Sequence, residues 1–214
     1  MKNLSILKEI EQFARQYNLP IIGSRKGEVL INVIKKYKPK RILEIGTLIG
    51  YSTILMASYL KDGKITTIEI DNKVAEIAKE NFKKAKFFNI NLITGNALNI
   101  IPKLKEKFDM LFLDAAKEEY YSYLKYAEPK LNKNAVIVDD IISTGNTILE
   151  TAKILRRLGA KKIYCICVHG IFVNDAFKKL KKAGINVVST NTIPNKAAKI
   201  DVSGVIGEDL LKQS

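Results

Sequence analysis

The chain has 214 residues, of which 47% are hydrophobic and 27% charged, and its formal net charge is +14. This length and composition indicate a globular chain that can bury the core of one α/β domain. No apolar run approaches the roughly 20 residues that a membrane helix needs, and the first residues lack the apolar core of a signal peptide. A cytoplasmic protein without a membrane partner is therefore expected.

The positive charge has two interpretations. An RNA or polyphosphate partner would explain it, and so would a lysine-rich surface of the kind that hyperthermophile proteins carry. The lysines are spread over many expected helices, with one denser run at residues 35–41. Aromatic residues do not alternate with basic ones as they do in single-strand binders. The thermophile-like interpretation is therefore favoured over a nucleic-acid partner.

Hydrophobic patterns predict strands and helices that alternate along the chain. Strands are expected over residues 41–45, 64–70, 91–94, 108–113, 135–138, 162–168, 187–190 and 199–202. Helices are expected over residues 4–17, 27–37, 53–59, 72–86, 147–158, 174–183 and 205–212. This order predicts a single α/β domain with a doubly wound, mostly parallel, three-layer Rossmann-like sheet of about seven or more strands.

Polar residues and glycines follow the first strands of the predicted sheet. The first strand leads into a turn at residues 44–52 whose glycines have the spacing G-x-x-x-G, and a helix follows. In Rossmann-type units such a turn faces the phosphate or carboxylate of a ligand. Glu69 lies at the tip of the second strand, the usual position for an acid that binds ribose hydroxyls. Because parallel strands end at one edge, these groups are expected at one crevice.

Four motifs in this part agree in order and spacing with a known family. They cover residues 43–52, 68–71, 95–98 and 113–120. Through them, residues 1–138 resemble the cation-dependent O-methyltransferases that use S-adenosylmethionine (SAM), among them the catechol, caffeoyl-CoA and tRNA-hydroxyuridine methyltransferases. The resemblance implies a SAM site formed by Glu44, Gly46, Thr47, Gly50, Ser52, Glu69, Asn96, Ala97 and Asp114.

The same resemblance implies a general base and a divalent metal ion. Lys117 is the candidate base near the acceptor hydroxyl, and Asp114 and Asp140 are the candidate metal ligands. A metal ion would lower the pKa of the acceptor oxygen and orient it for methyl transfer. The family pattern has further ligands where this chain has Ala116 and Ile141, so the Mg²⁺ site is incomplete. Magnesium is still compatible with it, because this ion keeps many of its waters.

A second resemblance begins in the strand at residues 135–138. The loop after this strand has Gly145, which tolerates a positive φ, together with hydroxyl groups and the start of a helix, and such a loop can bind an anion. It resembles the phosphoribosyl pyrophosphate (PRPP) loop of type I phosphoribosyltransferases, and residues 135–214 resemble the C-terminal part of ribose-phosphate pyrophosphokinase. The resemblance assigns a phosphoribosyl group to Asp139, Asp140, Ser143, Thr144, Gly145, Asn146 and Thr147.

The two resemblances divide the chain into a methyltransferase-like half, residues 1–138, and a phosphoribosyltransferase-like half, residues 139–214, which together complete one sheet. Pyrophosphokinase activity is not expected, because the nucleotide site of that family lies in the half without a counterpart here. No linker separates the halves, so we hypothesise an engineered or recombined chimera.

Three functions stay open: a SAM-binding O-methyltransferase-like protein with weak or no turnover, a non-catalytic phosphate- or PRPP-binding module, and a protein made for its fold alone. A homodimer also stays open.

Overall fold

The computed structural model describes residues 4–139, 141–142, 145–157, 163–167, 169–191 and 193–200. Within these ranges one eight-stranded sheet has the order β10-β9-β7-β5-β4-β1-β2-β3. Its strands are β1 (Arg41–Ile45), β2 (Lys64–Glu69), β3 (Ile90–Thr94), β4 (Phe108–Leu113), β5 (Leu131–Asp139), β7 (Ile163–Cys167), β9 (Ile185–Thr190) and β10 (Ala198–Ile200). All neighbouring strands are parallel, which confirms the predicted fold class.

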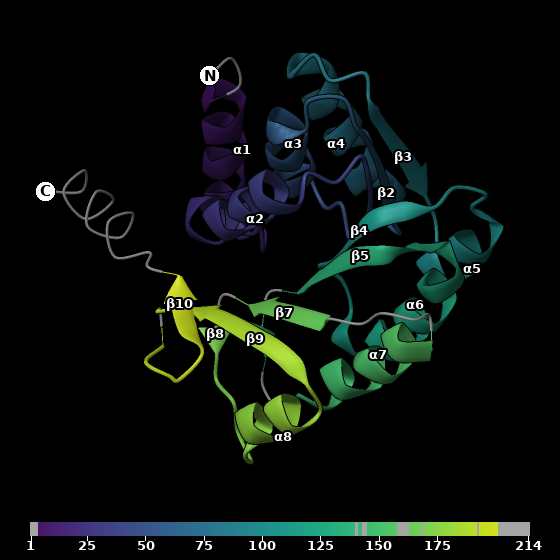
Figure 1. The fold of residues 1–214 in the computed structure, drawn as a ribbon. Helices are drawn as coiled ribbons and strands as arrows, with labels where there is room; N and C mark the ends of the chain where they lie inside the picture. The colour runs from purple at the N-terminus through teal and green to yellow at the C-terminus, as the bar shows by residue number, and fades with distance from the viewer. Residues whose placement is uncertain are drawn as a thin grey trace, which may run out of the picture.

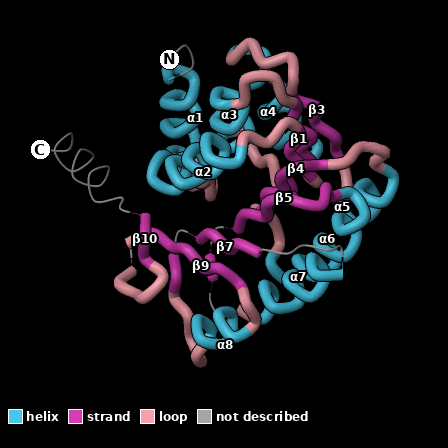
Figure 2. Tube along the Cα trace, viewed as in Figure 1, coloured by secondary structure: helices cyan, strands magenta, loops and turns pink. Residues whose placement is uncertain are grey.

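Helices cover both faces of this sheet, so the domain has three layers (Figure 1). They are α1 (Leu4–Gln16), α2 (Gly23–Tyr37), α3 (Tyr51–Tyr59), α4 (Asn72–Lys84), α5 (Ala97–Ile100), α6 (Tyr120–Ala127), α7 (Asn146–Arg157) and α8 (Ala176–Lys182). The first four lie on one side of the sheet and the last four on the other (Figure 2). Two very short strands, β6 (Ile141–Ile142) and β8 (His169–Gly170), pair apart from the main sheet.

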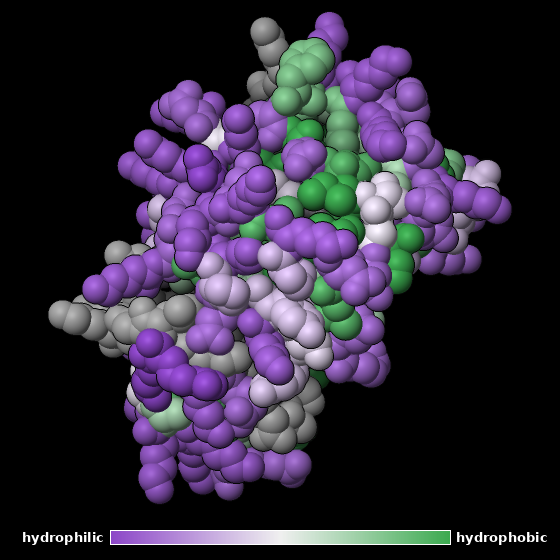
Figure 3. Space-filling model, turned by 90° about the vertical axis from the view of Figure 1, so that its right-hand side faces the viewer, coloured by the Kyte–Doolittle hydropathy of each residue, from purple (hydrophilic) through white to green (hydrophobic). Residues whose placement is uncertain are grey.

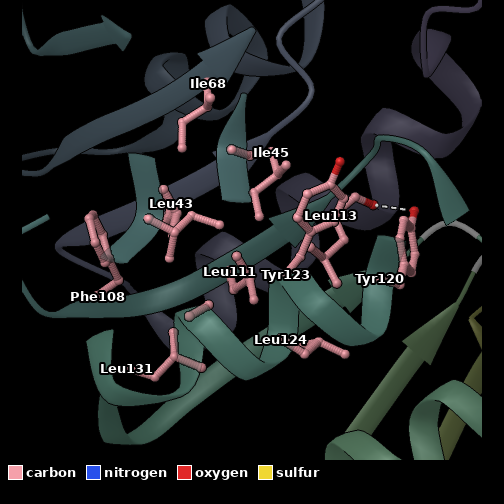
Figure 4. Packing of buried hydrophobic residues seen from close by; sticks show 13 residues of the cluster. Leu43, Ile45, Ile68, Phe108, Leu111, Leu113, Tyr120, Tyr123, Leu124 and Leu131 are labelled. Carbon is pink, nitrogen blue, oxygen red and sulfur yellow. Dashed lines mark hydrogen bonds between the residues drawn. The ribbon is translucent and has the colours of Figure 1, made fainter. Parts of the chain in front are cut away.

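Successive strand residues point into two different cores. In β1, Ile42 packs against α2 and α3, whereas Leu43 joins the cluster that α6 covers. Figure 4 shows this second cluster, in which the Tyr120 hydroxyl donates a hydrogen bond of 3.2 Å to the main-chain oxygen of Leu113. A strand that is apolar on both faces is what a parallel sheet between two helix layers requires. Packing into these two cores therefore fixes the register of the strands, and with it the positions of their carboxyl ends.

The predicted elements that the structure describes differ from the observed ones mainly at their ends, whereas α5, α6, β6 and β8 were not predicted. Helix α2 begins at Gly23, four positions before the predicted start, and β5 begins at Leu131 rather than at residue 135. The polar residues at the start of β5 hid this extension, since a polar strand end has no apolar pattern. The helix predicted over residues 205–212 lies outside the described residues.

The surface carries many hydrophilic side chains. On the face shown in Figure 3 they predominate, and hydrophobic residues gather in the upper central part. Among the described helices, none is both long and apolar enough to cross a membrane.

We expect Phe112→Ala to lower the free energy of unfolding by about 3–5 kcal/mol, because it would leave a cavity in the core. Phe112 is 1% exposed, whereas Phe88 is 93% exposed. Phe88→Ala is therefore the matched control, with an expected change of no more than about 0.5 kcal/mol. Urea unfolding followed by circular dichroism measures both values. Similar losses for the two variants would contradict the assignment of this core.

Candidate functional site

The crevice of the sheet lies where β1 and β4 are neighbours. The chain runs from β1 outward to β3 and then returns to the other side of β1, so this is the point at which the strand order reverses. Gly46 follows β1 with φ 95°, and its N–H donates to the Ile68 oxygen at 3.0 Å. A Cβ atom at Gly46 would clash with the main-chain oxygen of Asp114. Only glycine lets the two strand ends approach this closely.

The turn after Gly46 is held by the carboxylate of Glu69. Leu48 has φ 47°, a backbone conformation that leucine rarely adopts, and its N–H donates to Glu69 Oε2 at 2.7 Å. The Asp71 N–H donates to Glu69 Oε1 at 3.0 Å. Gly50 closes the turn with φ 84° and precedes α3. Each Glu69 oxygen has more than one acceptor position, so the carboxylate can still accept hydrogen bonds from a ligand.

The end of β3 joins the same site. The N–H of Gly95 donates to the main-chain oxygen of Glu69 at 2.7 Å. Asn96 caps α5, because its Oδ1 accepts from the Leu98 N–H at 2.8 Å, and Ala97 is buried. The structure therefore brings Asn96 and Ala97 next to Glu69.

Beneath the turn lies a buried polar cluster. Glu44 is fully buried, and its two carboxylate oxygens accept hydrogen bonds of 2.5 Å from the hydroxyls of Ser52 and Thr53. The hydroxyls of Thr47 and Thr67 lie 2.5 Å apart in the same layer. Burial raises the pKa of Glu44 to about 7, the charge of Asp114 adds to this effect, and the hydroxyl donors oppose it. Glu44, Thr47 and Ser52 thus support the turn from below, and their predicted contact with SAM stays a prediction.

The predicted catalytic and metal residues are only partly described. Asp114 follows β4 and is half-buried, and Lys117 begins a short 3-10 helix (Lys117–Glu119). Asp139 is the last residue of β5 and is paired with Leu113 of β4, so both strands end at this edge. Asp140 lies outside the described residues. Within the described part of the chain, no group of three His, Cys, Asp or Glu residues could hold a metal ion.

The predicted phosphoribosyl loop is also described in part. Gly145 has φ 73°, as its position before a helix predicted, and α7 begins at Asn146 and continues through Thr147. Gly145 is buried, and a Cβ atom there would lie 3.3 Å from Leu180 of α8. Ser143 and Thr144 lie outside the described residues. The backbone that precedes α7 is therefore supported by α8.

Three residues of this site were not predicted from the sequence. Leu48 provides an N–H to Glu69, and Thr53 and Thr67 belong to the cluster around Glu44. Thr53 follows Ser52 directly, and Thr67 faces Glu44 in the parallel register. The polarity of Thr53 and Thr67 in otherwise apolar elements was the signal that could have identified these two residues, whereas Leu48 carried no such signal.

Comparisons with known proteins give two matches that overlap over residues 130–165, from β5 to the start of β7. The family model described as O-methyltransferase matches residues 1–165. The phosphoribosyl synthetase-associated domain matches residues 130–211. Both parts of the predicted resemblance are therefore confirmed.

Individual relatives agree with these family models. A catechol O-methyltransferase from Niastella koreensis is 36% identical over 138 residues, which cover 61% of this chain and 62% of that protein. A ribose-phosphate pyrophosphokinase from Pyrococcus abyssi is 49% identical over 70 residues, 33% of this chain and 25% of that enzyme. The chain thus spans about three fifths of the first relative and a quarter of the second.

Solved structures show the same fold. An O-methyltransferase from Bacillus cereus in complex with SAH superposes with a TM-score of 0.61 at 31% identity, covering 72% of this chain and 77% of that one. The SAM complex of the O-methyltransferase TomG from Streptomyces achromogenes superposes with a TM-score of 0.60 at 30% identity, covering 72% and 75%.

We expect Glu44→Gln to remove a pH dependence of stability. Between pH 4.5, the ordinary pKa of the unfolded group, and about 7, only the unfolded state releases the proton, so the free energy of unfolding falls as pH rises. Relative to the native protein, Glu44→Gln should gain about 3 kcal/mol between pH 4.5 and pH 8. Urea unfolding at both pH values measures this difference, with the exposed Glu80→Gln as control. Parallel pH profiles of native protein and Glu44→Gln would contradict the burial of an ionisable carboxyl at this position.

Proposed function

Because the chain belongs to the O-methyltransferase family, we propose that it is a SAM-dependent O-methyltransferase that binds its cofactor at the carboxyl ends of β1–β4. The observation that carries this proposal is the Glu69 carboxylate, which holds the turn through the Leu48 N–H and keeps acceptor capacity on both oxygens. The similar Bacillus cereus enzyme is a complex with SAH, which supports the same class of ligand here.

The charge of this edge fits a cationic ligand. Acidic residues lie at the carboxyl ends of two strands that flank β1: Glu69 and Asp71 at β2, and Asp114 at β4. SAM carries a positively charged sulfonium, so these carboxylates favour its approach. A polyphosphate ligand such as PRPP would be repelled here unless a divalent cation accompanied it.

Different residues of the site would bind different parts of SAM. Gly46 and Gly50 shape the turn against which the methionine part would lie, and Glu69 would accept hydrogen bonds from the ribose hydroxyls. Asn96 and Ala97 would flank the adenine. SAM, when bound, supplies an electrophilic methyl group. The position of Lys117 after β4 suits a base that takes the proton of an acceptor hydroxyl at this edge.

The metal ion has less support than the cofactor. Among the described residues no cluster fits a divalent cation, and Asp140, the second predicted ligand, lies outside them. We assign no step of the reaction to magnesium.

A second candidate function is PRPP or phosphate binding at the loop before α7. Two observations favour it: the match of residues 130–211 to the phosphoribosyl synthetase-associated domain, and the left-handed Gly145 directly before α7. Because β4 and β5 end at the same edge, a phosphate there would compete for the space of a methyl acceptor. The chain covers a quarter of the pyrophosphokinase from Pyrococcus abyssi, so a kinase reaction is not part of this proposal.

We also propose that residues 1–138 and 139–214 were recombined within one sheet. Two family matches that overlap over residues 130–165, a range that includes the proposed junction, support this proposal.

Calorimetric titration with SAH tests the first function. We expect Glu69→Gln to weaken SAH binding at least tenfold, because two hydrogen bonds to a carboxylate are worth roughly 1.5–3 kcal/mol each. Glu80→Gln, on the exposed side of α4, should bind as the native protein does. If the native protein binds no SAH, or if Glu69→Gln binds it unchanged, the proposed SAM site is wrong.

Titration with PRPP and magnesium tests the second function. We expect Thr144→Ala to weaken PRPP binding by roughly tenfold through the loss of a phosphate hydrogen bond. SAH binding should be unchanged in this variant. Thr151→Ala, farther along α7, is the matched control. If the native protein binds SAH but not PRPP, the second function is wrong and only the methyltransferase proposal remains.

A further inference from the structure

Basic side chains gather at the amino edge of the sheet, opposite to the crevice. Because the strands are parallel, segments far apart in sequence begin at this one edge. The exposed basic residues at or before the starts of β1 to β5 are Lys35, Lys36, Lys38, Lys40, Arg41, Lys61, Lys64, Lys86, Lys103, Lys105, Lys107 and Lys133. They outnumber the acidic residues of the same segments, so the edge has a positive potential, whereas the carboxyl edge is acidic.

Hydrogen bonds tie the first residues of β1, β4 and β5 together. The N–H groups of Lys40 and Arg41 donate to Asp109 Oδ2 at 2.9 and 3.0 Å, and Asn132 Nδ2 donates to Asp109 Oδ1 at 2.7 Å. Although burial opposes it, these bonds hold the pKa of Asp109 below its usual range. The ionised carboxylate of Asp109 is thus engaged within the edge and offsets part of the charge of Arg41, but the basic residues of this edge still outnumber the acidic ones.

The same edge continues to β2 and β3. The Lys64 N–H donates to the Lys40 oxygen at 2.8 Å, and Asn89 Nδ2 donates to the Gly63 oxygen at 2.8 Å. Phe88 precedes Asn89 and is 93% exposed, the most exposed large hydrophobic side chain of the described residues. Phe88 follows the exposed Lys86 shortly before β3, and an exposed aromatic ring at such a position can stack on a single-stranded base.

A hollow of about 240 Å³ lies in this edge. Lys40, Arg41 and Lys64 line it together with the carboxylates of Asp62 and Glu106. The cations suit phosphate groups, and the carboxylates suit hydroxyl and amino donors. A ligand with both kinds of group fits this lining better than a plain polyphosphate does, and RNA offers phosphates, base amino groups and 2′-hydroxyls.

We propose that the amino edge of the sheet is a docking surface for single-stranded RNA. Phosphates bind Lys40, Arg41 and Lys64, a base stacks on Phe88, and the carboxylates in the hollow accept from sugar or base. This surface lies at the edge opposite to the SAM crevice, so the RNA held here is a bound partner and not the methyl acceptor. The inference does not depend on the proposed transferase activity.

Fluorescence anisotropy with a labelled 12-nucleotide RNA of mixed sequence tests this surface on the full chain. We expect the double variant Lys40→Glu with Lys64→Glu to bind more than tenfold more weakly than the native protein. Its plot of log affinity against log salt should be less steep by about 1.4, since each lost phosphate contact on a single strand contributes about 0.7. The matched control, Lys179→Glu with Lys182→Glu on α8, changes the net charge equally and should stay within about twofold.

A second pair of variants tests the aromatic contact. Phe88→Ala should bind at least fivefold more weakly, because stacking of a base on an aromatic ring contributes roughly 1–3 kcal/mol. Tyr121→Ala, which removes another exposed ring (54% exposed), should bind as the native protein does. Duplex RNA and DNA of the same sequence should bind more weakly than the single-stranded RNA.

Several results would overturn the proposal. They are no binding at 0.15 M salt, equal losses in the two charge-reversal variants, an unchanged affinity of Phe88→Ala, and equal affinity for duplex RNA or DNA. Circular dichroism and SAH titration of each variant confirm that the fold is intact, so that a failure of RNA binding is separate from a failure of the SAM site.

Discussion

The site depends on one constraint, the close approach of the backbone at Gly46 to the backbone at Asp114. The ends of β1 and β4 meet there without a side chain between them. The chain can therefore turn at Gly46 toward β2, where the Glu69 carboxylate accepts a hydrogen bond from the Leu48 N–H. The end of β3 is attached to the same residue, because the Gly95 N–H donates to the main-chain oxygen of Glu69. Gly46 thus brings the ends of β1, β4 and β2 together, Gly95 adds the end of β3, and the ligand crevice is a consequence of that arrangement.

Much of this arrangement could be predicted, because the signals were local. Apolar runs placed the strands, and the glycines and Glu69 after them placed the crevice. The conformation of Leu48 could not be predicted, since a positive φ at leucine is imposed by its tertiary hydrogen bond to Glu69. Glu44 was predicted to contact a ligand, whereas its location beneath the turn depends on Ser52, Thr53 and Thr67 together. The basic edge was missed as well, because its lysines are distant in sequence and only the parallel topology collects them.

Strand β5 explains how two family patterns coexist in one chain. It lies between β4 and β7, with Asp139 opposite Leu113 and Val138 opposite Ile166. The second half of β5, residues 135–138, is apolar and lies between two parallel neighbours, a requirement that strands from different families meet equally well. The features that distinguish the two family matches therefore lie in the loops and helices after the strands rather than in β5.

The strand order also determines how the protein can fold during synthesis. β1 can pair with β2 once both have been made, but the partner of its other edge, β4, comes later in the chain than β3. Contacts between such distant segments form slowly. An unpaired central strand is a template for association with other chains. The sheet that places the site thus leaves the central strand β1, whose residues 42–45 are buried in the folded protein, open along one edge until β4 has been made.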